Sequence, residues 1–267
     1  MKDSRLASIA RAAFASAVLT CAISLGGQAR AADQTTITVF AAASLHDAFT
    51  DIATRFATAH PGVTVRLNFD GSQILETQIA NGAPADVFAS ADERWMDNAL
   101  KAGLVGTPVD FARNSIVMVA QFDVHVRSLR DLTRDGLKLA ICAEQVPCGR
   151  YTRIALQKMS ADKAFWPKYE EQVMRNVATQ EQNVEGVVQK VLLGEADAGF
   201  VYATDVVQKG VKLLNYPVPD EDQELATYPI AEVKASAQAA LARSFVEYVI
   251  SAQGQSVLAS YGFRTHS

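Results

Sequence analysis

The chain has 267 residues, of which 49% are apolar and 20% are charged. This length suggests one or two domains with a sizeable core, and the apolar content is too high for a disordered chain. The formal net charge of −4 argues against a nucleic-acid binder with a basic footprint.

The N-terminal segment has the features of an export signal. Basic residues at Lys2, Arg5 and Arg11 precede an uncharged stretch over residues 12–25, which is shorter than the roughly 20 residues of a membrane-spanning helix. The sequence Ala-Arg-Ala at positions 29–31 then matches a signal-peptidase site. We expect residues 1–31 to be a cleavable signal peptide, so that a mature chain with a net charge of −7 begins near Ala32 in the periplasm.

Cys21 within this segment leaves an alternative open, in which the chain is a lipoprotein anchored there. Lipoprotein signals have Gly, Ala or Ser before the cysteine, whereas this chain has Thr20. We therefore expect export with cleavage rather than anchoring.

The mature chain alternates short apolar strands with periodic helices, a pattern typical of an α/β fold. The first helix illustrates the periodicity, because Leu45, Phe49, Ile52 and Phe56 recur at spacings of three and four residues. Further helices are predicted to start near Ser72, before Trp95, near Gly149, after Asn183 and before Leu241. Strands are predicted over residues 35–41, 63–69, 86–90, 115–120, 137–142, 198–201, 211–214 and 226–231.

No linker of low complexity divides the chain, yet it is long for one sheet. We expect two lobes joined by crossing strands near Arg113 and Leu214. Residues 32–113 and 214–267 then form the first lobe, and residues 114–213 form the second.

Cys142 and Cys148 are close enough in sequence to form a disulfide in an oxidising compartment. Two free thiols are the alternative. A metal site is less favoured because the spacing is not C-x-x-C and because His125 has no second histidine near it in the sequence.

Four strand-to-helix junctions share one arrangement, in which a small or polar residue stands where a helix begins. They lie at Ala43-Ser44, Gly71-Ser72, Cys148-Gly149 and Asn183-Val184. Each helix start presents unpaired N–H groups and the positive end of a helix dipole, which together can bind an anion without a cation. Hydroxyl groups of Ser44, Ser72 and Tyr202 would add donors. The plainer interpretation makes the serines and Asn183 ordinary helix caps and Tyr202 a core aromatic residue.

An ordered set of motifs resembles the periplasmic molybdate-binding proteins of ABC importers. The set extends from about Ile37 to Phe263, and its specificity comes from the order and spacing of segments that are individually weak. The matching segments are VFAAASL (39–45), AFTDI (48–52), NF (68–69), GSQ (71–73), GAPADVF (82–88), SAD (90–92), WMD (95–97), VP with Gly149 (146–149), NV (183–184), GFVY (199–202) and YGF (261–263).

The resemblance implies a two-lobed periplasmic binding protein fold of type II, in which each lobe is a mixed sheet flanked by helices and the ligand cleft lies between the lobes. It implies high-affinity binding of molybdate, and of tungstate, for delivery to a membrane permease and its ATPase subunit. No cofactor, nucleic acid or enzymatic activity is expected, and we expect a monomer. In the family, hydroxyl and N–H groups at Ser44 and Ser72, N–H groups at Cys148 and Val184, and the hydroxyl of Tyr202 hold the oxyanion, which would be the only molybdenum in the protein.

Two residues depart from the family pattern. Cys148 stands where the family often has a smaller residue, which a backbone donor tolerates if the side chain points away. Asp70 adds a carboxylate beside Ser72, and it is either an outward turn residue or an acceptor for the proton of an anion such as hydrogen phosphate.

Two rival functions remain open at this point. Sulfate, phosphate or a small carboxylate could occupy the same architecture, although carboxylate binders usually present an arginine fork, and only Arg150 and Arg153 lie near a proposed contact. A serine hydrolase built on Ser44 or Ser72 is remote, because neither serine lies in a G-x-S-x-G motif and His46 would point to another helix face.

Overall fold

The computed structural model describes residues 35–207 and 212–265. The predicted signal peptide, its cleavage site and Cys21 lie outside the described residues. Among the helices within them, none combines the length and the apolar character that crossing a bilayer requires.

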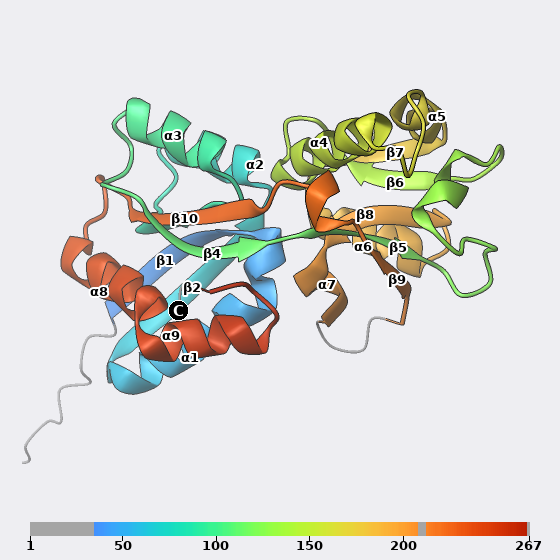
Figure 1. The fold of residues 1–267 in the computed structure, drawn as a ribbon. Helices are drawn as coiled ribbons and strands as arrows, with labels where there is room; N and C mark the ends of the chain where they lie inside the picture. Colours follow the sequence, from blue (N-terminus) through green and yellow to red (C-terminus); the bar gives the residue numbers. More distant parts are fainter. Residues whose placement is uncertain (1–34, 208–211, 266–267) are drawn as a thin grey trace, which may run out of the picture. The chain divides into compact units, whose positions relative to one another are not determined.

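The first sheet has five strands in the order β2-β1-β3-β10-β4. Its centre is parallel, because β1 (Thr35–Ala42) pairs in parallel with both β2 (Val63–Asp70) and β3 (Val87–Ala89). β10 (Ala226–Glu232) then runs antiparallel to β3 and to β4 (Val109–Asn114). The sheet is therefore mixed, and the chain returns to it after visiting the second sheet (Figure 1).

Both faces of the first sheet are covered by apolar side chains, as a parallel centre requires. Alternation along β1 sends Val39 into one cluster, with Phe49 of α1, and Phe40 into another, with Leu75 of α2. α1 (His46–Ala59) packs with α8 (Ala239–Ile250), where the rings of Phe56 and Phe245 lie 5.1 Å apart. α2 (Ser72–Ala80) and α3 (Glu93–Lys101) cover the other face (Figure 1).

The second sheet also has five strands, in the order β7-β6-β8-β5-β9. β6 (Leu139–Cys142) is parallel to β7 (Val177–Glu181) and to β8 (Ala198–Tyr202), whereas β5 (Ile116–Ala120) is antiparallel to β8 and to β9 (Leu214–Pro217). The helices of this part are α4 (Pro147–Ala161), α5 (Tyr169–Arg175), α6 (Val184–Leu192) and α7 (Ala203–Val207).

The chain crosses between the two sheets twice, each time through a short connection. β4 ends at Asn114 and β5 begins at Ile116, so the first connection is the single residue Ser115. The second lies between Pro217 and Ala226 and includes the 3-10 turn Asp220–Asp222. The predicted crossing near Leu214 is wrong, because β9 begins there and pairs with β5.

The displacement of this boundary has a simple cause. The apolar run at residues 211–214 suggested a strand, whereas the strand that pairs is Leu214–Pro217, in which half-buried and exposed residues alternate. β7 was not predicted for a similar reason. It lies at the edge of the sheet, its residues alternate between half-buried and exposed, and it carries polar side chains. Four further elements were not predicted from the sequence: β4, α5, α7 and α9 (Ala252–Ser260).

Candidate functional site

A small cavity lies where strands of both sheets end and the helices that follow them begin. Its empty space, including the part open to solvent, is only about 210 Å³. All five residues predicted to bind the ligand line it. The lining consists of Ala42, Ala43, Ser44, Asp70, Gly71, Ser72, Ala91, Val146, Pro147, Cys148, Asn183, Val184 and Tyr202.

Four helical segments begin at this cavity. The 3-10 turn Ala43–Leu45, α2 and α4 each start without a side-chain capping hydrogen bond from any described residue. α6 is capped by Asn183, but the side chain of Asn183 accepts from the N–H of Gly186 rather than from that of Val184. Because first-turn N–H groups have no partner inside a helix, these starts provide donors at the cavity wall.

Both serine hydroxyls are held by neighbours: Ser72 keeps its hydrogen to donate, and Ser44 keeps its own when Tyr228 is the donor of their shared hydrogen bond. Ser72 Oγ accepts from the N–H of Ala91 at 3.0 Å. Ser44 Oγ lies 3.0 Å from Tyr228 Oη, and Asn114 Nδ2 donates to the same Tyr228 oxygen at 3.4 Å. If the phenol donates to Ser44 Oγ, the Ser44 hydrogen is directed elsewhere, and the cavity is the adjoining space.

Tyr202 differs from the serines because its hydroxyl oxygen is buried and finds no hydrogen-bond partner among the described protein atoms. The residue is 1% exposed. Burial, together with the nearby Tyr228, raises the pKa of Tyr202 well above its usual value, so the hydroxyl stays protonated and can donate. An unpaired donor at a buried position costs free energy unless an acceptor reaches it.

The start of α4 is fixed by two cysteines and a glycine. Cys142, at the end of β6, forms a disulfide with Cys148, and their Cα atoms lie 5.9 Å apart. A Cβ on Gly149 would lie 2.0 Å from the carbonyl oxygen of Ala143, so only glycine permits this approach of helix to strand. The Cys148 side chain is thus tied to β6.

Asp70 is the only charged residue among the described residues that line the cavity. It is half-buried rather than outward, and its Oδ1 accepts from the N–H of Gly71 and from Asn183 Nδ2. Arg150 instead pairs with Glu224, and Arg153 donates to the carbonyl oxygens of Cys142 and Gly149. The cavity therefore offers neutral donors suited to a small anion that only accepts hydrogen bonds.

Among the described residues, the hydroxyl of Ser44 pairs with a tyrosine and that of Ser72 with a backbone N–H. Ser44 pairs with Tyr228, while His46 Nδ1 lies 2.8 Å from Asp47 and its ring lies against Phe69. Sequence reasoning missed Tyr228 and Asn114, because Ser44 and Tyr228 are 184 positions apart and no local pattern connects them.

Comparison with known proteins agrees with this architecture. The family model described as bacterial extracellular solute-binding protein matches residues 37–264. The chain is 41% identical over 230 residues to the molybdate-binding protein ModA of Mycobacterium bovis, covering 85% of this chain and 84% of the relative. It is 38% identical over 261 residues to ModA of Escherichia coli, covering 94% and 96%.

Among solved structures, the periplasmic molybdate-binding protein of Azotobacter vinelandii superposes with a TM-score of 0.75 at 21% identity, covering 86% of this chain and all of that one. With the two mixed sheets, this likeness confirms the predicted type II periplasmic binding protein fold. The chain belongs to the bacterial extracellular solute-binding protein family.

Proposed function

We propose that this protein binds molybdate, and also tungstate, in the cavity and delivers it in the periplasm to the permease of an ABC importer and its ATPase. The observation that carries the proposal is a buried set of donors with no cation among the described lining residues, and with the hydroxyl of Tyr202 left without a partner among the described protein atoms. Relatives at 38–41% identity that are named for molybdate binding support the choice of ion. The proposed role is transport rather than catalysis.

The ligand set we propose has five residues. Ser44 and Ser72 would donate through hydroxyl and backbone N–H groups, Cys148 and Val184 through backbone N–H groups, and Tyr202 through its hydroxyl. Hydrogen bonds to a charged group contribute roughly 1.5–3 kcal/mol each, so about four offset the entropy of binding enough for micromolar or tighter affinity.

Selectivity against protonated anions would come from the same donors. Molybdate and tungstate are fully deprotonated near neutral pH and only accept hydrogen bonds, whereas hydrogen phosphate needs an acceptor for its proton. Asp70 is the one carboxylate in the described lining, and its Oδ1 is already engaged by the N–H of Gly71 and by Asn183 Nδ2. Sulfate has the charge of molybdate and a smaller radius, so its rejection would depend on the size of the cavity.

Each sheet with its helices forms one lobe in this proposal. The first lobe contains residues 35–114 and 226–265, the second contains residues 116–217, and the mature protein works as a monomer. An ion held from both lobes stabilises the closed arrangement, because its binding free energy is realised fully only when both sets of donors reach it.

Competitive calorimetry with molybdate, tungstate, sulfate and phosphate tests the function. We expect molybdate and tungstate to bind at micromolar concentrations or below, with sulfate and phosphate at least about 100-fold weaker. Tight phosphate binding, or the absence of molybdate binding, would contradict the proposal.

A further inference from the structure

The two lobes contact each other beside the cavity through a short segment at the end of β2. Asp70 Oδ1 accepts from Asn183 Nδ2 of the second lobe at 2.9 Å. One residue later, the backbone of Gly71 lies against the carbonyl of Gln182, and Gln73 Nε2 donates to that same oxygen at 2.7 Å. Two consecutive residues of the second lobe are therefore held by residues 70–73.

The Asp70 contact determines how the side chain of Asn183 is oriented. Asn183 Oδ1 accepts from the N–H of Gly186 at 3.0 Å and so caps α6. Its Nδ2 group donates to Asp70, and a flipped amide would place two oxygens together. Asp70 thus holds the cap in the orientation that fixes the start of α6, where Val184 faces the cavity.

Gly71 is required by the approach of the lobes rather than by its own backbone. Its φ of −62° and ψ of 139° are values that any residue adopts. A Cβ at this position would nevertheless lie 2.3 Å from the carbonyl oxygen of Gln182 in the other lobe. It would also lie 2.5 Å from Nε2 and Oε1 of Gln73 in its own lobe, but that flexible side chain can move aside, whereas the backbone of Gln182 can move only if the lobes part.

We propose that Asp70 and Gly71 form a closure clasp: Asp70 is a positioning residue that holds the cap of α6 from the opposite lobe, and Gly71 provides the space that closure needs. The inference rests on the proposed function, since it assigns these residues to the closed form of the oxyanion site. The clasp gives the Asp70 carboxylate a structural role at the cavity wall, although its charge repels a dianion.

Substitutions at Asp70 separate positioning from charge. In Asp70→Ala the clasp is lost, and the dissociation constant for sodium molybdate rises about 10- to 100-fold, mainly through faster release. In Asp70→Asn the amide oxygen still accepts from Asn183 and Gly71, so the affinity stays within about threefold of wild type. If the charge alone mattered, both variants would bind molybdate more tightly, and that result would overturn the assignment.

Gly71→Ala tests closure without relying on charge. We expect its dissociation constant for molybdate to rise about 10-fold or more, because the added methyl group meets a backbone carbonyl. The melting temperature of the ligand-free variant stays within about 2 °C of wild type, because the backbone conformation suits alanine. Gly106→Ala is the matched control, since the atoms nearest to its Cβ would belong to the flexible side chain of Glu232, from 3.0 Å.

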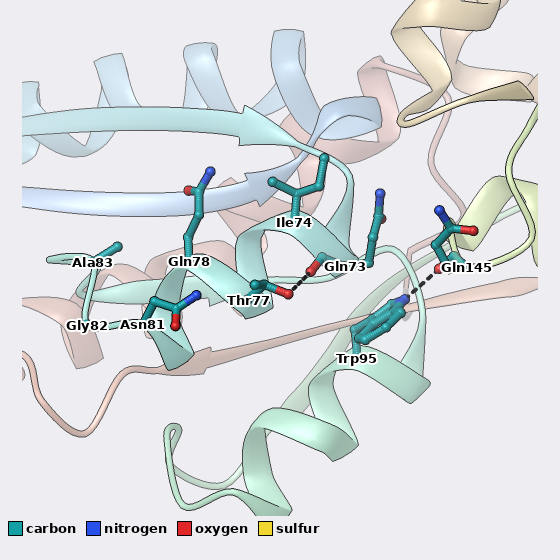
Figure 2. Close-up of a pocket in the computed structure, with 9 residues that line it drawn as sticks. All are labelled: Gln73, Ile74, Thr77, Gln78, Asn81, Gly82, Ala83, Trp95 and Gln145. Atoms are coloured by element: carbon teal, nitrogen blue, oxygen red, sulfur yellow. Dashed lines mark hydrogen bonds between the residues drawn. The ribbon is translucent and has the colours of Figure 1, made fainter.

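Closure can be followed with an intrinsic probe. Trp95 of α3 donates its indole N–H to the carbonyl of Gln145 in the second lobe at 2.9 Å, as Figure 2 shows. In a Trp166→Phe background, stopped-flow fluorescence of Trp95 with sodium molybdate reports closing and release. Equal affinity and release rate in Gly71→Ala and wild type would overturn the clasp, whereas a wild-type protein that does not bind molybdate would overturn the proposed function.

Discussion

At the scale of single residues, Tyr202 offers the cleanest test of the site, because phenylalanine differs from it by one hydroxyl. In Tyr202→Phe we expect molybdate affinity to fall by roughly 1.5–3 kcal/mol, the contribution of one hydrogen bond to a charged ligand. The ligand-free protein should keep its melting temperature or gain slightly, because the hydroxyl removed is buried and unpaired by protein atoms. Calorimetry and thermal melts measure the two effects, and unchanged affinity would remove Tyr202 from the ligand set.

The buried carboxyl group of Asp205, which accepts a hydrogen bond from the backbone N–H of Tyr202, makes the stability of the fold depend on pH. Burial raises the pKa of Asp205 from 3.8 to about 8, although its Oδ2 accepts from the N–H of Tyr202. The folded chain therefore holds a proton that the unfolded chain releases near pH 4. This contribution to stability is fully present below pH 4 and is lost as the pH rises towards 8.

In Asp205→Asn, the amide oxygen can still accept from the N–H of Tyr202, and the side chain does not titrate between pH 5 and pH 8. Between pH 5 and pH 8 the melting temperature of the ligand-free wild type should fall more steeply than that of the variant. Each kcal/mol of difference corresponds to about 2–4 °C for a chain of this size. Parallel curves for the two proteins would show that Asp205 does not titrate in this range.

At the scale of elements, the disulfide joins the end of β6 to the first turn of α4. Closing a loop of about seven residues stabilises the fold by roughly 2–2.5 kcal/mol in the chain-entropy model. We expect reduction to lower the melting temperature by about 5–10 °C. The double variant Cys142→Ala/Cys148→Ala should melt at the same temperature with and without reductant, and an equal response of both proteins would contradict this role.

The junctions of strands and helices were predictable because their signals are local. Leu45, Phe49, Ile52 and Phe56 recur at helical spacing and are all buried. The contacts across the site were not predictable in the same way. Asp70 meets Asn183 across 113 positions, and its neighbours in sequence suggested only a turn. Pairings of this kind depend on the topology that brings the two sheets together, which periodicity does not encode.

At the scale of the whole molecule, the net negative charge of the chain repels the anion that we propose it binds. The formal charge of the full sequence is −4, and the described cavity lining contributes one carboxylate and no cation. Attraction must then come from N–H and O–H dipoles, which act over short distances. A site built on lysine or arginine would instead attract its ligand over the Debye length.

Salt dependence distinguishes these two kinds of site. Raising NaCl from 20 to 200 mM shortens the Debye length from roughly 20 Å to about 7 Å. A cationic site would lose affinity for molybdate over this range, whereas here screening relieves the repulsion between a negative protein and a dianion. We therefore expect the association rate, followed by stopped-flow fluorescence, to stay constant or rise, with the dissociation constant changing less than about threefold. A marked loss of affinity with salt would mean that a cation outside the described lining takes part in holding the ion.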